Sequence, residues 1–108
     1  MVKPLKSNEE LIKATVEVIK EFLPDAVVIV YDSRAKGYYR PNSDLDVAIL
    51  TDGEVPAPLI AQIREKLDEL PTLVSFDLVD LKTVSEEFKK VILKEGKVVY
   101  DGRSEKKT

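Results

Sequence analysis

The chain has 108 residues, 44% of them hydrophobic, which suits one compact domain with a single core. With 17 basic and 20 acidic residues, its formal net charge of −3 excludes a general electrostatic attraction to nucleic acid or to an anionic membrane. The absence of cysteine and histidine excludes disulfides, thiolate metal sites and the commonest general base. Any catalysis must therefore depend on carboxylates.

The N-terminal part of the chain predicts a helix, a buried strand and a loop. Ser7 and Glu10 have the spacing of a capping box, and Pro24 ends a helical stripe made of Ile12, Val16, Ile19 and Leu23. Residues 26–31 are apolar and mostly β-branched, so we expect a central strand that is covered on both faces. Residues 32–43 carry Gly, Pro, Asn and Ser between two strands, which indicates a functional loop.

Two more strands and a helix are predicted in the middle of the chain. Residues 45–50 are mainly apolar and are followed by turn residues, which is typical of a strand. Residues 59–70 have apolar side chains at helical spacing until Pro71. Residues 73–81 predict another strand, in which Asp77 interrupts an otherwise apolar segment.

The C-terminal part predicts a third helix, a last strand and a tail. Thr83 and Glu86 again have capping-box spacing, and the helix after them has an apolar stripe of Val84, Phe88, Val91 and Ile92. Residues 97–100 form a short final strand. We expect one domain over residues 1–102 and a polar, unpacked tail over residues 103–108. This order of elements predicts an α/β (α+β) fold, with helices flanking a sheet of about four strands.

No segment of the chain predicts a membrane or nucleic-acid partner. The first ten residues are polar, unlike a signal peptide, and no apolar run approaches the length of a membrane span. We therefore expect a cytoplasmic location. Basic residues are not concentrated in one stretch, which disfavours nucleic acid as a partner.

Three aspartates carry the predicted chemistry. Asp44 and Asp46 lie two residues apart at the start of a strand, so their side chains point to one face and repel each other. A hard divalent cation relieves such repulsion, and Mg²⁺ is the ion that we expect. Asp77 reaches the same face if its strand neighbours residues 45–50, which adds a ligand for a second ion. Of the three aspartates, Asp77 is the one best suited to accept the proton of the nucleophile.

Each of these aspartates also has a structural interpretation. Asp44 could cap the turn after Ser43, while Asp46 and Asp77 could lie on a solvated face of the sheet. Asp80 competes with Asp77 for the third role. However, strand parity places Asp80 on the opposite face, beside the start of the next helix, so we assign it a structural role.

The segments around these aspartates resemble a known family. They are residues 31–37 (Tyr-Asp-Ser-Arg-Ala-Lys-Gly), 43–48 (Ser-Asp-Leu-Asp-Val-Ala) and 76–81 (Phe-Asp-Leu-Val-Asp-Leu). They resemble the motifs of the minimal nucleotidyltransferases in the DNA polymerase beta superfamily, in which Gly-Ser, an Asp-x-Asp pair and a later strand Asp follow in this order. The resemblance covers nearly the whole chain and implies the nucleotidyltransferase fold with a mixed sheet.

The resemblance also implies an activity, a partner and roles for residues. Such a protein transfers a nucleoside monophosphate, AMP by family expectation, from ATP or another nucleoside triphosphate to a hydroxyl. The acceptor would be a tyrosine of a helical HEPN protein, for which this chain would be the antitoxin. Residues that would hold the triphosphate are Ser33, Arg34 and Gly37. Residues that would bind two Mg²⁺ ions and carry catalysis are Asp44, Asp46 and Asp77.

One position departs from the family pattern. Asp32 stands where the family has Gly, and its carboxylate would repel a triphosphate by about 1 kcal/mol or more. Two interpretations are therefore open: an active enzyme, which the complete set of aspartates favours, or a catalytically weakened binding partner with an antitoxin role. In either case no second domain for binding an acceptor is obvious in the sequence, so we expect a partner protein or a homo-oligomer.

Overall fold

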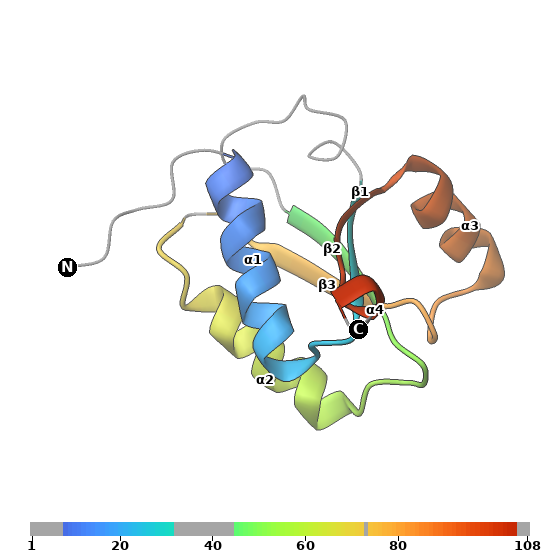
Figure 1. Cartoon of the computed structure of the whole chain (residues 1–108), viewed down its shortest axis with the longest axis horizontal. Coiled ribbons are helices and arrows are strands. Elements are labelled where there is room, and N and C mark those ends of the chain that lie inside the picture. Colours follow the sequence, from blue (N-terminus) through green and yellow to red (C-terminus); the bar gives the residue numbers. More distant parts are fainter. Residues whose placement is uncertain (1–7, 32–44, 73, 106–108) are drawn as a thin grey trace.

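The structure is a computed structural model that describes residues 8–31, 45–72 and 74–105. Helices and strands follow one another in the predicted order (Figure 1). The elements are α1 (Asn8–Phe22), β1 (Val27–Tyr31), β2 (Leu45–Leu50), α2 (Ala57–Asp68), β3 (Phe76–Asp80), α3 (Glu86–Glu95), β4 (Lys97–Asp101) and α4 (Gly102–Glu105). The predicted α/β (α+β) fold class, with helices flanking a mixed sheet, is confirmed.

The strands form one four-stranded sheet in the order β3-β2-β1-β4. β1 pairs antiparallel with β2 and with β4, whereas β2 and β3 are parallel and α2 connects them. All five residues of β1 are buried, as expected for a central strand with an uninterrupted apolar sequence. The parallel pairing of β2 with β3 brings together the two strands that carry the predicted aspartates.

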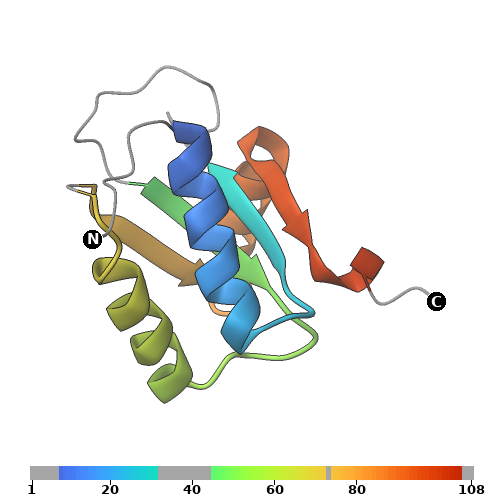
Figure 2. The ribbon, with the colours of Figure 1, turned by 60° about the vertical axis from the view of Figure 1, so that its left-hand side comes forward.

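Helices cover both faces of the sheet (Figures 1 and 2). α1 and α2 pack against each other on one face, and α3 lies over the other face. Because side chains alternate along a strand, Val28, Val30 and Val47 join the core under α1 and α2, whereas Ile29 and Ala48 face α3. Within the described ranges, no helix is long and apolar enough to cross a membrane.

The buried stripe of α1 includes a polar residue that the sequence analysis left out. Thr15 is fully buried between Leu11 and Ile19, one helical turn away on either side. Its hydroxyl donates a hydrogen bond of 2.8 Å to the carbonyl oxygen of Leu11, so its burial leaves no polar group without a partner. Ser7, the predicted cap of this helix, lies outside the described residues.

The start of α3 differs from the prediction. Ser85 is the N-cap, because its side chain accepts a hydrogen bond of 3.2 Å from the backbone N–H of Phe88. Thr83 instead donates its hydroxyl to the carbonyl oxygen of Asp80 at 2.9 Å. The predicted capping box of Thr83 and Glu86 is therefore wrong: a strand-end carbonyl competes for the threonine, and the next hydroxyl residue caps the helix.

Asp80 has the structural role that the sequence analysis assigned to it. Asp80 is the last residue of β3 and is only 5% exposed. One carboxylate oxygen accepts a hydrogen bond of 2.8 Å from the N–H of Val55, and the other accepts one of 2.9 Å from the N–H of Lys82. Val55 belongs to the β2–α2 loop and Lys82 to the β3–α3 loop. A single carboxylate therefore fixes both loops that leave the parallel strands.

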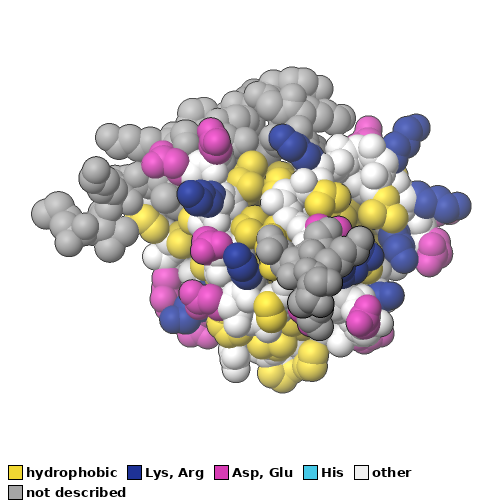
Figure 3. Space-filling model, viewed as in Figure 1, with side chains coloured by type: hydrophobic (Ala, Val, Ile, Leu, Met, Phe, Trp, Pro, Cys, Tyr) yellow, Lys and Arg dark blue, Asp and Glu magenta, His cyan; other side chains and the backbone are white. Residues whose placement is uncertain are grey.

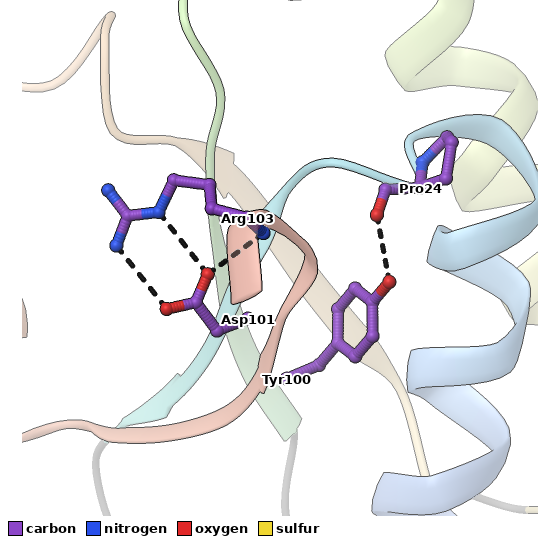
Figure 4. A network of polar contacts seen from close by, with 4 residues as sticks. All are labelled: Pro24, Tyr100, Asp101 and Arg103. Carbon is purple, nitrogen blue, oxygen red and sulfur yellow. Dashed lines mark hydrogen bonds and ion pairs between the residues drawn. The ribbon is translucent and has the colours of Figure 1, made fainter. Parts of the chain in front are cut away.

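The end of β4 is attached to the end of α1 (Figure 4). The hydroxyl of Tyr100 donates a hydrogen bond of 2.8 Å to the carbonyl oxygen of Pro24. The N–H of Gly102 donates one of 2.9 Å to Ala26, and a side chain at position 102 would collide with the carbonyl oxygen of Pro24. Only glycine allows this close approach of the two segments.

The first residues of the predicted tail are folded. Gly102–Glu105 form the short helix α4, whereas the sequence analysis expected an unpacked tail from residue 103. Asp101 accepts a hydrogen bond of 3.0 Å from the backbone N–H of Arg103 and one of 3.2 Å from its guanidinium (Figure 4). This hydrogen bonding and the carboxylate charge raise the pKa of Arg103. The local ion pair explains why a polar sequence holds a helical turn here. Residues 106–108 lie outside the described ranges.

The bracing role of Asp80 is testable by substitution. Asp80→Ala should lower the free energy of unfolding by about 2–4 kcal/mol, because two backbone N–H groups lose a charged acceptor. Urea denaturation measures this loss. The slope of the free energy of unfolding against urea concentration should be the same in the variant and the unmodified protein. Asp68→Ala removes an exposed carboxylate at the end of α2 and, as the matched control, should change the value by less than about 0.5 kcal/mol. Equal losses in both variants would contradict the role.

Candidate functional site

Three side chains form a row across the face of the sheet that α3 covers. The strand register pairs Tyr31 of β1 with Asp46 of β2, and Asp46 with Asp77 of β3. Neighbouring strands lie about 5 Å apart, so the two carboxylates are adjacent. The condition that the sequence analysis set for Asp77, a strand next to β2, is therefore met.

The row forms one side of a cleft of about 360 Å³. The other side comes from α3, which contributes Phe88, Val91 and Glu95. Asp77 is exposed and Asp46 is half-buried, so both residues are accessible to solvent. The cleft thus combines a polar floor with a largely apolar wall.

The apolar stripe predicted for α3 is only partly buried. Phe88, Val91 and Ile92 belong to this stripe, but of these three only Ile92 is buried. Phe88 is 39% exposed and Val91 is 48% exposed, and both line the cleft. The physical reason lies beneath them: closing α3 onto Asp46 and Asp77 would remove two carboxylates from water at a high cost in free energy. Helical periodicity alone does not reveal what a helix face meets.

Tyr31 links the wall to the floor. It is 8% exposed, and its ring contacts the ring of Phe88 edge to face, with centroids 6.0 Å apart and planes at 83°. Because Tyr31 is also the strand partner of Asp46, the contact fixes Phe88 relative to the carboxylates. The sequence analysis missed this role of Tyr31, since a tyrosine at the end of an apolar strand carries no local signal for it.

The remaining predicted site residues lie outside the described residues. They are Ser33, Arg34, Gly37 and Asp44, together with the departing residue Asp32. In the described part of the chain, no group of three acidic side chains is placed to hold a metal ion. The structure therefore places two of the three predicted metal ligands, Asp46 and Asp77, and brings them together.

The carboxylate pair can hold a hard divalent cation. Asp46 and Asp77 present oxygen ligands from adjacent strands, the ligand type and arrangement that Mg²⁺ accepts when phosphate or water completes its shell. Over the face seen in Figure 3, basic and acidic side chains are interspersed. Anionic phosphate would therefore be held by local contacts and by a bound cation rather than by a broad positive surface.

Comparison with known proteins identifies the family by sequence. The family described as Polymerase beta, Nucleotidyltransferase matches residues 9–105. A relative from Haemophilus influenzae, named probable protein adenylyltransferase MntA, is 35% identical over 92 residues, which cover 83% of this chain and 77% of the relative. The family match over residues 9–105 includes all four strands and both described aspartates.

Solved structures share the fold. A chain from a toxin-antitoxin structure with AMP-PNP has a TM-score of 0.70 at 22% identity, over 92% of this chain and 77% of that chain. A chain from a complex of tri-AMPylated Shewanella oneidensis HEPN toxin with MNT antitoxin has a TM-score of 0.69 at 16% identity, over 92% and 76%. As its resemblance to minimal nucleotidyltransferases predicted, the chain belongs to the polymerase beta nucleotidyltransferase family.

Proposed function

We propose that this protein transfers AMP from ATP to a tyrosine hydroxyl of a helical HEPN protein and thereby acts as its antitoxin. The observation that carries the proposal is the adjacent pair Asp46 and Asp77 in an open cleft. The name of the Haemophilus influenzae relative, a protein adenylyltransferase, supports AMP as the transferred group. The structures with AMP-PNP and with an AMPylated HEPN toxin, which share the fold, agree with the nucleotide and the partner.

The two carboxylates suggest how the reaction proceeds. Mg²⁺ bound by Asp46 and Asp77 would neutralise charge on the phosphates and on the oxygens of an in-line displacement. The acceptor oxygen forms a bond to the α-phosphorus while the bond from that phosphorus to the bridging oxygen breaks, and pyrophosphate leaves. Asp77 is exposed at the edge strand of the sheet and takes the proton of the acceptor hydroxyl.

The remaining roles follow the family motifs. Asp44 would complete the carboxylate set for two metal ions, while the triphosphate would be held by Ser33, Arg34 and Gly37. In the sequence, these residues lie between Tyr31, the last residue of β1, and Leu45, the first residue of β2. The acceptor comes from another molecule, and we propose a cytoplasmic location for the pair.

A second function remains as an alternative. Asp32 places a negative charge in the segment that would hold the triphosphate, and this charge would weaken nucleotide binding. A protein weakened in this way would neutralise its partner by binding alone. The adjacent carboxylates favour the enzyme, because they offer the oxygen ligands that a metal-dependent transfer needs.

Metal binding is testable without a nucleotide. Mn²⁺, which also accepts oxygen ligands, should broaden the backbone NMR signals of Asp46 and Asp77 first, with an affinity in the millimolar range because phosphate ligands are missing. Asp77→Asn should weaken the affinity about tenfold. Asp68→Asn, which changes an exposed carboxylate on α2, should have no effect. Broadening centred away from β2 and β3 would contradict the assignment.

The reaction is testable with a HEPN protein from the same genome. Incubation with ATP and Mg²⁺ should add AMP to a tyrosine of that protein, detected by mass spectrometry of the intact protein. Asp77→Asn should slow the transfer at least about 100-fold, because a metal ligand and the proton acceptor are lost together. Its free energy of unfolding should stay within about 0.5 kcal/mol, since Asp77 is exposed. Transfer at an unchanged rate would exclude Asp77 from catalysis.

The effect of Asp32 separates the two functions. The unmodified protein should bind ATP with Mg²⁺ in a calorimetric titration, and Asp32→Gly should bind it about fivefold more tightly, the equivalent of about 1 kcal/mol of repulsion. Lys36→Gly serves as a control for added backbone freedom in the same segment and should not tighten binding. Binding by the glycine variant alone would favour the catalytically weakened binding protein.

A further inference from the structure

The candidate cleft has a polar floor and a largely apolar wall, and the proposed reaction accounts only for the floor. Asp46 and Asp77 suit a metal ion and phosphate. The side chains of Phe88 and Val91 offer neither charge nor hydrogen-bonding groups, yet they stay 39% and 48% exposed beside the carboxylates. A triphosphate gains nothing from an apolar wall, so the wall indicates a ligand with an apolar part.

The wall is fixed in position before any ligand arrives. Phe88 lies in the first turn of α3, where Ser85 caps its backbone N–H, and its ring rests edge to face on the buried Tyr31. The adjacent Ile92 is fully buried and holds the helix against the sheet. An aromatic ring that is already held in this way binds a second ring at a small cost in conformational entropy.

The size of the cleft and its place within one chain point to the nucleotide rather than the acceptor. A volume of about 360 Å³ lies in the range of small-molecule sites. The base is joined through ribose to the α-phosphate, so it must lie within a nucleotide's length of Asp46 and Asp77. An acceptor tyrosine brings its own protein surface to cover its ring, whereas the base depends on this chain.

Resting on the proposed function, we propose that Phe88 and Val91 form the nucleobase subsite, in which Phe88 stacks on the base. Neither side chain can donate or accept hydrogen bonds, so Phe88 and Val91 recognise the area of the ring, while the carboxylate of Glu95 is the polar group that α3 adds to the cleft. The subsite therefore favours purine over pyrimidine nucleotides.

Calorimetry with the full chain and Mg²⁺ tests the subsite by comparing ATP with inorganic tripolyphosphate, which lacks the base. Phe88→Ala should weaken ATP binding about tenfold and leave tripolyphosphate binding within twofold. Phe88→Tyr keeps the ring and should bind ATP as the unmodified protein does. Leu93→Ala, another exposed apolar residue of α3 that does not line the cleft, should change neither affinity.

The outcomes separate the subsite from the proposed function. If the unmodified protein binds both compounds with equal affinity, or if Phe88→Ala weakens both alike, the nucleobase subsite is wrong while phosphate binding at the carboxylates stands. If Phe88→Ala leaves ATP binding intact and slows only transfer to the acceptor, the wall belongs to the acceptor and our assignment is overturned. Failure of the unmodified protein to bind either compound would remove the proposed function together with the subsite.

Discussion

The parallel pairing of β2 with β3 is the constraint on which the rest of this structure depends. It sets Asp46 beside Asp77, two like charges on neighbouring strands, and a fold tolerates that arrangement only where solvent, hydrogen bonds or a cation compensate it. A parallel pair also requires a crossover, which α2 provides on the opposite face. Asp80, three residues after Asp77 on β3 and on the other face of the sheet, fixes the two loops that leave these parallel strands. Packing on one face thus holds a repulsive pair in place on the other.

The two faces of the sheet have opposite requirements. Under α1 and α2, apolar strand side chains such as Val28, Val30 and Val47 are buried, and this face provides most of the apolar burial. Under α3, the same strands present Asp46 and Asp77, so the helix cannot close onto the sheet along its whole length. The cleft is therefore a direct result of two carboxylates placed where a core would otherwise form.

The sequence predicted those parts of the fold that depend on local patterns. The uninterrupted apolar run of β1 indicated its central place, and the position of Asp77 within a strand was readable from its neighbours. Strand order was not predictable, because the pairing of β2 with β3 depends on contacts between residues distant in the sequence. The exposure of Phe88 was missed for a related reason: periodicity tells which residues of α3 share a side, but not that acidic residues of another element lie opposite.

The open cleft also decides what kind of acceptor the protein can use. An enzyme that encloses its substrates needs a second layer of structure over the site, and α3 is the helix that covers the Asp46 and Asp77 face of the sheet in the described part of the chain. Asp77, the residue proposed to take the acceptor's proton, lies on the edge strand β3 and is exposed. A hydroxyl on the surface of a large partner can reach such a position, whereas a small free alcohol would find little surface to hold it. The geometry that leaves Asp77 exposed at the edge of the sheet thus suits the protein acceptor that we propose.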